Sequence, residues 1–127
     1  MTSPGISILV VEDEAMTAMY METFLRRKGY EVLKRVSTGE DAVYSVHSLK
    51  PDLVLMDIRL AGKMDGIESA SKILSETDSA VQVIFTTGYT DVELKDRALL
   101  LNPLGFFIKP VNMPELIKTI ESFFYRT

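Results

Sequence analysis

Cysteine is absent from this chain of 127 residues, which excludes disulfide bridges, thiol chemistry and cysteine-bound metals. This composition fits a reducing cytosol. No apolar run approaches the roughly 20 residues that a membrane-spanning helix needs, and no signal-peptide pattern opens the sequence. Positive charge is also scarce: the net charge is −4, without the basic excess that a nucleic-acid backbone attracts. We therefore expect a soluble cytoplasmic protein that binds neither membranes nor nucleic acids directly.

The length and composition fit one compact domain over residues 1–127. Hydrophobic residues make up 46% of the chain, an ordinary share for a globular protein. A chain of this length buries a core without disulfides or metals as staples. No low-complexity segment, linker or sequence repeat divides it. A single domain of this kind fits a small protein or a module of a longer one.

Five apolar segments alternate with five amphipathic ones along the chain. Expected strands cover residues 6–11, 31–36, 53–56, 81–85 and 105–108, and expected helices cover residues 14–28, 39–49, 65–76, 91–101 and 114–125. The first, third and fourth strands are apolar throughout, which is typical of strands buried on both faces. With right-handed crossovers, this alternation predicts an α/β fold with a five-stranded, parallel, doubly wound sheet.

Polar side chains follow the apolar runs at the point where each expected strand ends. Glu12 and Asp13 follow the first strand and Asp57 follows the third. Thr87 comes after the fourth strand and Lys109 after the fifth. In open parallel sheets ligands bind beyond the carboxyl ends of the strands, near the point where the strand order reverses. We therefore expect these five side chains to gather at one edge of the sheet.

The chemistry of this set favours a metal-dependent phosphoryl acceptor. Carboxylates without sulfur or histidine nearby suit Mg²⁺ or Mn²⁺. Lys109 can offset their charge and hold a phosphoryl oxygen as a point charge, and the hydroxyl of Thr87 can donate to another. The simpler interpretation is that Glu12 and Asp13 only favour the N-terminus of the next helix. Their combination with the groups at the other strand ends favours the functional interpretation.

At this point the sequence resembles a known family. The segments ILVVEDE, DLVLMDIRLAGKMDGIE, VIFTTGY and GFFIKP are similar, in their order and spacing, to receiver domains of two-component response regulators, such as the bacterial chemotaxis regulator. They cover essentially the whole chain and are specific in combination, although each is weak alone. The resemblance implies a flavodoxin-like sheet of strand order 2-1-3-4-5 with five helices.

The resemblance also implies the roles of the acidic residues. Asp57 would accept the phosphoryl group of a phosphohistidine on a sensor histidine kinase or a histidine phosphotransfer protein. Glu12, Asp13 and Asp57 would hold Mg²⁺ together with the backbone carbonyl of Arg59. Glu12 stands where many members of the family have aspartate, a frequent change that leaves metal binding intact.

A switch and a cis peptide bond are implied in the same way. Thr87 and Lys109 would contact the phosphoryl oxygens. Phe106 matches the aromatic residue that turns inward when the threonine moves, and without the hydroxyl of the commoner tyrosine it would act by packing alone. The bond between Lys109 and Pro110 would be cis, so that the lysine points at the acids.

The segment after the acceptor departs from the commonest pattern of the family. Between Asp57 and Gly66 it is one residue longer than the usual form, and it contains Gly62-Lys63. Ala61 replaces the usual proline. We expect this segment to alter the rim of the metal site or a contact with a partner.

Two large residues are expected to lengthen the life of the phosphorylated state. Arg59 and Tyr89 lie two residues after the acceptor and the switch threonine, where side chains border the path of an attacking water. Since hydrolysis needs that water in line, bulk at these positions predicts slow self-dephosphorylation. The alternative is that both side chains point to solvent.

The expected helix at residues 14–28 carries methionines on two sides. Tyr20 and Met21 fit its core face by their spacing. Met19 falls on the opposite face with Ala15 and Ala18, where it would form a small apolar patch beside the acids. Such a patch could seat a helix of a kinase.

Other functions fit the sequence less well. His47 is the only histidine and lies in the helix at 39–49, so we interpret it as an ordinary surface or half-buried residue rather than a phosphorelay donor. An aspartyl-nucleophile phosphatase or phosphotransferase usually needs a second acid two residues after its nucleophile, where this chain has Arg59. A flavin- or nucleotide-binding module would meet repulsion from residues 12–14. A docking module that works without phosphorylation leaves the acid, threonine and lysine set unexplained.

We therefore predict a phosphorylation-dependent signalling switch that assists its own phosphorylation but is not a turnover enzyme. The resemblance allows a fused output or kinase domain and a phosphorylation-dependent dimer.

Overall fold

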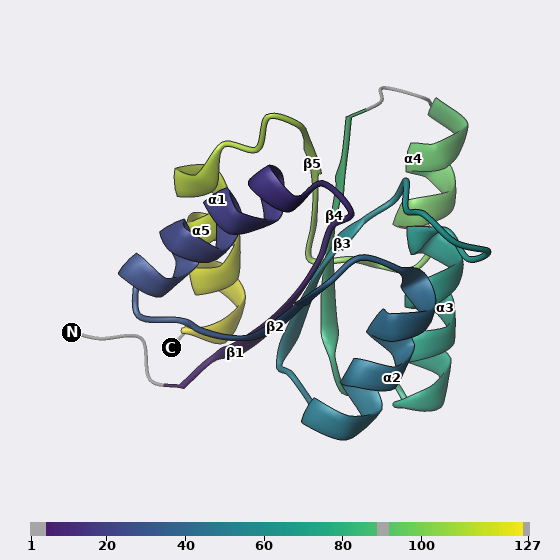
Figure 1. Ribbon diagram of the computed structural model, residues 1–127, viewed down its shortest axis with the longest axis horizontal. Coiled ribbons are helices and arrows are strands. Elements are labelled where there is room, and N and C mark those ends of the chain that lie inside the picture. The colour runs from purple at the N-terminus through teal and green to yellow at the C-terminus, as the bar shows by residue number, and fades with distance from the viewer. Residues whose placement is uncertain (1–4, 89–91, 126–127) are drawn as a thin grey trace.

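The computed structural model describes residues 5–88 and 92–125, which form a sheet of five parallel strands between two layers of helices (Figure 1). The strands are β1 (Ser7–Val11), β2 (Glu31–Val36), β3 (Leu53–Asp57), β4 (Gln82–Thr87) and β5 (Gly105–Ile108). The helices are α1 (Ala15–Arg27), α2 (Gly39–Leu49), α3 (Gly66–Glu76), α4 (Val92–Leu99) and α5 (Met113–Phe124). The strand order is β2-β1-β3-β4-β5, which confirms the predicted doubly wound sheet.

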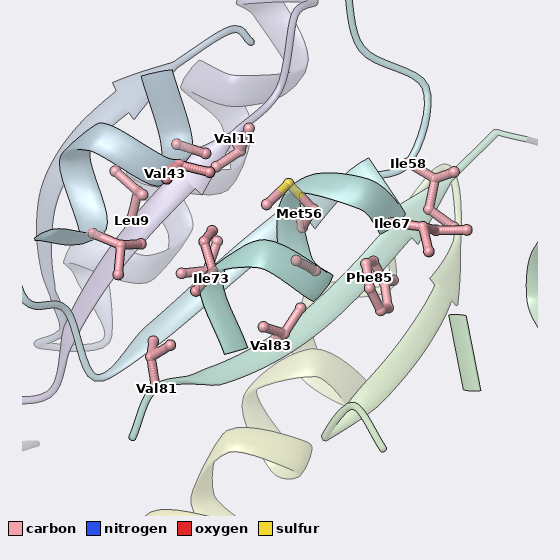
Figure 2. Close-up of a cluster of buried hydrophobic side chains, with 14 of the residues drawn as sticks. Leu9, Val11, Val43, Met56, Ile58, Ile67, Ile73, Val81, Val83 and Phe85 are labelled. Atoms are coloured by element: carbon pink, nitrogen blue, oxygen red, sulfur yellow. The ribbon is translucent and has the colours of Figure 1, made fainter. Parts of the chain in front are cut away.

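The central strands are buried on both faces, as their continuous apolar sequences predicted. In β1, Leu9 and Val11 join the core under α2 and α3, whereas Ile8 and Val10 join the core under α1 and α5. Figure 1 shows α1 and α5 on one face of the sheet and α2, α3 and α4 on the other. Figure 2 shows the larger cluster, in which strand side chains such as Phe85 pack against the inner faces of α2 and α3.

Two elements differ from the expected boundaries by more than one residue. Strand β4 extends through Thr87 because Thr86 pairs with Asp57 of β3 and Thr87 pairs with Ile108 of β5. Helix α4 ends at Leu99 instead of residue 101, since Asn102 adopts a left-handed conformation with φ of 54°. The expected start of that helix at residue 91 lies outside the described residues.

The start of α3 lies directly behind the third strand. A Cβ atom at Gly66 would lie 2.0 Å from the carbonyl oxygen of Asp57, so glycine is needed for this approach. Asp65 and Glu68 form a reciprocal capping box at the same place, with hydrogen bonds of 2.8 and 2.9 Å. The end of β3 is therefore held against a well-capped helix, which fixes the position of Asp57.

Candidate functional site

Three carboxylates converge where β1 and β3 end, at the point where the strand order reverses. One carboxylate oxygen from each of Glu12, Asp13 and Asp57 lies within 4.8 Å of the others. The backbone N–H of Glu12 donates to the carbonyl of Val36 at 2.9 Å, so the ladder between β1 and β2 continues up to the acidic residue. Backbone pairing therefore fixes where Glu12 stands, and the structure brings together the acids that the sequence placed at strand ends.

Lys109 reaches these acids from the end of β5. Its Nζ lies 2.6 Å from Oε1 of Glu12 and 3.1 Å from Oδ2 of Asp57. The peptide bond to Pro110 is cis, as predicted, and the backbone N–H of Lys109 donates to the carbonyl of Thr87 at 2.7 Å. A single ammonium group thus contacts both buried carboxylates of the site.

The two contacted carboxylates are almost inaccessible to solvent. Glu12 is 3% exposed and Asp57 is 2% exposed, whereas Asp13 is exposed. Burial is the main reason that the pKa of Asp57 rises to about 7; the negative charge of Glu12 raises it further, and Lys109 lowers it only in part. Burial alone would lower the pKa of Lys109, but Glu12 and Asp57 together outweigh it and raise that pKa. The pocket therefore carries more negative charge than one lysine offsets.

The donor set fits a hard divalent cation. Oε2 of Glu12 accepts a hydrogen bond of 3.0 Å from the backbone N–H of Glu14. Oε1 of Glu12 is buried, and its partner is the Lys109 ammonium at 2.6 Å. Three carboxylate oxygens within 4.8 Å of one another are hard ligands, and a cation bound by Glu12, Asp13 and Asp57 would reduce their mutual repulsion.

Arg59 follows the end of β3, and Thr87 ends the neighbouring strand β4. The backbone N–H of Arg59 donates to Oδ1 of Asp57 at 3.3 Å, and the rest of Arg59 is exposed. Thr87 is fully buried at the end of β4. Tyr89, which the sequence paired with Arg59 as a shield, lies outside the described residues.

Phe106 lies on β5 and is partly buried against the core cluster beneath α4. Lys95 of α4 places its Nζ 5.7 Å from the centroid of the Phe106 ring, within the range of a cation–π contact. The predicted switch aromatic is therefore in contact with α4 and with the core on that face of the sheet.

Helix α1 presents an apolar surface beside the acids, although its faces differ from the prediction. Met16, Met19 and Tyr20 are 80, 55 and 54% exposed, whereas Ala18 is buried. The assignments of Tyr20 to the core and of Ala18 to the outer patch were therefore wrong, because the small Ala18 packs toward the sheet. A hollow of about 430 Å³ lies next to this surface and is lined by Glu14, Met16, Thr17, Tyr20, Met21, Lys109, Pro110 and Val111.

His47 lies away from the acids. Its Nε2 is 2.6 Å from Oε1 of Glu76 on α3, and this contact lowers the pKa of that glutamate. Together with Asp52 and Val81, which precede β3 and β4, it lines a hollow at the opposite edge of the sheet. This position fits the interpretation of His47 as a surface residue.

The sequence analysis did not single out two residues near the site. Glu40 of α2 accepts a hydrogen bond of 3.2 Å from the backbone N–H of Lys63, which is 23 residues away along the chain. Gly66 is required by its approach to the Asp57 carbonyl. No sequence pattern indicates the first contact, whereas a glycine directly after the N-cap acid of a helix is a signal that could have been used.

Comparison with known proteins identifies the family. The family model described as the response regulator receiver domain matches residues 8–121. The chain therefore belongs to the receiver domains of two-component response regulators, whose signalling depends on phosphorylation, and the predicted resemblance is confirmed. Receiver domains generally are not turnover enzymes.

The curated relatives differ in length from this chain. It is 34% identical over 114 residues to the transcriptional regulatory protein PdtaR of Mycobacterium tuberculosis, covering 90% of this chain and 54% of that protein. It is 36% identical over 121 residues to the transcriptional regulatory protein ZraR of Escherichia coli, covering 95% and 27% respectively. It is 34% identical over 117 residues to the chemotaxis protein CheY of Treponema pallidum, covering 91% and 80%. The chain thus spans about half of PdtaR and about a quarter of ZraR.

A solved structure confirms the fold. The signal receiver domain of a modulated diguanylate cyclase from Desulfovibrio desulfuricans superposes with a TM-score of 0.86 at 36% identity, covering 94% of this chain and 93% of that one.

In the part of the chain that the structure describes, no helix has the length and apolar character needed to cross a membrane.

The raised pKa of Asp57 predicts that the metal-free protein loses stability as the pH rises. The folded pKa is about 7, against 3.8 for an ordinary aspartate, so the folded state holds this proton more tightly than the unfolded state does. The resulting stabilisation is fully present below about pH 4 and is lost as the pH rises to about 7.

We therefore expect Asp57→Asn to be more stable than the wild type at about pH 8 in EDTA, by about 1–3 kcal/mol after allowance for screening. Urea unfolding at about pH 8 and about pH 4 measures this difference, which should shrink at the lower pH. A variant no more stable than the wild type at the higher pH would contradict the charge imbalance.

Proposed function

We propose that Asp57 accepts a phosphoryl group from the phosphohistidine of a sensor histidine kinase or a histidine phosphotransfer protein, in a reaction that depends on Mg²⁺ or Mn²⁺. The observation that carries this proposal is the buried Asp57 carboxylate, 3.1 Å from Lys109 and within 4.8 Å of two further acids. In the transfer, an Asp57 oxygen forms a bond to phosphorus while the bond from phosphorus to the histidine nitrogen breaks. The product is an acyl phosphate that sets the state of the signal.

The residues around Asp57 have separate roles in this reaction. Lys109 lowers the pKa of Asp57 in part and so favours the anion that attacks, and its ammonium would then hold a phosphoryl oxygen. The Thr87 hydroxyl would donate to another phosphoryl oxygen. Glu12, Asp13, Asp57 and the backbone carbonyl of Arg59 would hold the metal ion. When bound, the ion supplies positive charge that offsets the charge of the phosphoryl oxygens.

We infer that Thr87 and Phe106 transmit the phosphorylated state to the surface. Movement of Thr87 toward the phosphoryl group would leave room for the Phe106 ring to turn inward. Phe106 has no hydroxyl, so its two positions would differ in packing and in the contact with Lys95, 5.7 Å from the ring centroid. The surface formed by α4 and β5 would change accordingly and serve an output domain or a second copy of the chain.

The exposed apolar surface of α1 is the proposed docking site for the phosphoryl donor. Met16 and Tyr20 border the hollow that reaches Lys109 and Pro110, so a helix of the donor seated there would lie beside the acceptor pocket. Output domains are proposed from the names of PdtaR and ZraR, which are transcriptional regulatory proteins longer than this chain. These partners, together with the family, favour a cytoplasmic signalling module.

Incubation with acetyl phosphate and Mg²⁺, followed by intact mass measurement, tests the proposal. We expect the mass of one phosphoryl group to be added and to be lost in mild acid or base, as an acyl phosphate requires. A chain that stays unmodified under conditions that label a known receiver domain would favour a docking module that works without phosphorylation.

Arg59 is expected to slow self-dephosphorylation. Its backbone N–H donates to Asp57 and the residue is exposed, so we expect its side chain to border the path of a water that approaches the phosphorus in line. We expect Arg59→Asn to shorten the life of the phosphorylated protein by about threefold or more. The decay of the phosphorylated mass after removal of acetyl phosphate measures this lifetime. Arg59→Lys, which keeps the bulk and charge, is the control, and equal or slower decay in Arg59→Asn would count against shielding.

A further inference from the structure

The segment after Asp57 is attached to the first turn of α2. Its two ends are fixed by the fold: Ile58 donates its N–H to Thr86 and accepts from the N–H of Gly66, at 3.0 and 2.8 Å. Residues 60–64 between these ends lie outside regular elements, except that Ala61 forms an isolated parallel bridge with Thr38, the N-cap residue of α2.

Glu40 makes the second attachment of this segment to α2. Its Oε2 accepts the backbone N–H of Lys63 at 3.2 Å. Gly62 has φ of 95°, and a Cβ atom there would lie 3.2 Å from Oε1 of the same glutamate, so the chain turns directly against the carboxylate. Gly62 and Lys63 are thus the part of the segment that contacts Glu40.

The start of α2 is itself held firmly enough to act as an anchor. Ser69 of α3 donates its hydroxyl to the carbonyl of Gly39 at 2.9 Å in a buried position. A Cβ atom at Gly39 would lie 3.0 Å from the carbonyl oxygen of Met64, so the helix start presses against the segment. The start of α2 is therefore fixed by its contact with α3 and provides a stable support for the segment.

We propose that Glu40 is a positioning residue: it ties residues 60–64 to α2 and thereby holds the backbone of Arg59 at the metal site. The proposal rests on the proposed function, in which the Arg59 carbonyl is a metal ligand. Arg59 lies between the fixed Ile58 and the tied segment, so release of the tie at Lys63 leaves its carbonyl orientation less restricted. Because one hydrogen bond of ordinary strength is removed, the effects are modest and measurable.

The variants are Glu40→Ala, which removes the acceptor, and Glu40→Gln, which keeps an oxygen acceptor without the charge. Asp41→Ala is the matched control for the exchange measurement, because it removes the same charge from the same helix turn while the Asp41 side chain lines a hollow with Glu12 and Asp13. Gly62→Ala disturbs the same contact from the segment, because the added Cβ atom would lie 3.2 Å from Oε1 of Glu40 and φ of 95° is strained for alanine. Thermal unfolding verifies that each variant is folded.

Two measurements distinguish the loss of the hydrogen bond between Glu40 and Lys63 from its effect on the metal site. Amide hydrogen exchange at residues 60–64 in the metal-free protein reports the tie, and NMR titration with Mg²⁺ alone reports the metal site. In Glu40→Ala we expect exchange at Lys63 to rise about three- to tenfold and the Mg²⁺ affinity to fall about threefold. We expect Glu40→Gln to restore both, Gly62→Ala to reproduce both, and Asp41→Ala to leave the exchange unchanged.

Unchanged exchange in Glu40→Ala would overturn the tie, and so would Glu40→Gln behaving like Glu40→Ala. Faster exchange with unaltered Mg²⁺ affinity would overturn the positioning role. A wild-type protein that binds no Mg²⁺ would overturn the proposed function and the positioning role with it, while the exchange data would still decide whether Glu40 ties the segment.

Discussion

Replacement of Asp57 by asparagine is expected to abolish phosphorylation by acetyl phosphate. The amide has nearly the shape of the carboxylate but no anionic oxygen to attack phosphorus, and its neighbour Lys109 would keep only Glu12 as an anionic partner. We expect the labelled fraction to fall by at least about a hundredfold, since no other group replaces a missing nucleophile. Intact mass measurement after a fixed time with acetyl phosphate and Mg²⁺ gives the result.

Asp52→Asn is the control for this experiment. Asp52 precedes β3 at the opposite end from Asp57, and its carboxylate accepts hydrogen bonds from the backbone and hydroxyl of Ser7 at 2.9 and 3.1 Å. This control removes an aspartate next to the same strand without touching the pocket, so we expect labelling at the rate of the wild type. Equal labelling of Asp57→Asn and the wild type would show that another residue accepts the group.

Removal of divalent cations is expected to stop phosphorylation almost completely. Three carboxylates with oxygens within 4.8 Å of one another face one ammonium group, so the metal-free pocket repels an anionic phosphoryl donor. We expect EDTA to slow labelling by at least about a hundredfold and excess Mg²⁺ to restore it. The affinity for Mg²⁺ should be weak, because few protein ligands face a strongly hydrated ion.

Asp13→Asn separates this metal effect from a general effect of EDTA. Asp13 is the exposed member of the three acids, so its substitution weakens metal binding without leaving a buried charge unpaired. We expect this variant to need more Mg²⁺ for the same labelling rate, measured by titration of the rate with the metal. Labelling at the full rate in EDTA would refute metal dependence.

The positions of the acids could be predicted because they follow from backbone pairing. Continuous apolar runs identified the strands buried on both faces, and the carboxyl ends of parallel strands meet at one edge of the sheet. Glu12 and Asp57 are therefore neighbours in space although 45 positions apart in sequence, because each comes directly after a residue of the last pair, Val11 and Met56, in the register of β1 against β3. The position of Lys109 could be predicted by the same argument, since β5 is parallel to β4.

Contacts made by side chains across loops could not be predicted in this way. Nothing in the periodicity of α2 indicates that Glu40 bonds to Lys63, because the path of the intervening segment is not repetitive. The face of α1 was assigned incorrectly at two positions for a related reason: an alanine fits close to the sheet where a tyrosine does not, so Ala18 is buried and Tyr20 is half exposed. The spacing of apolar residues alone does not show which side chain is small enough to pack against the sheet.

The pKa of Asp57 also could not be predicted from the sequence. Its rise to about 7 depends first on burial and then on the distance to Glu12, and both are properties of the folded state. The sequence identified the residue as an acid at a strand end but not the free-energy cost of ionising it there. That cost is the physical reason to expect a cation at this site.

The location of the phosphoryl group in the labelled wild-type protein tests the central claim most directly. Protein labelled with acetyl phosphate and Mg²⁺ is treated with borohydride, which reduces an aspartyl phosphate to homoserine, and is then digested and sequenced by mass spectrometry. The account predicts homoserine at position 57 and nowhere else. A reduced residue at another acid, or a stable phosphate on a serine, threonine or histidine with Asp57 intact, would contradict it.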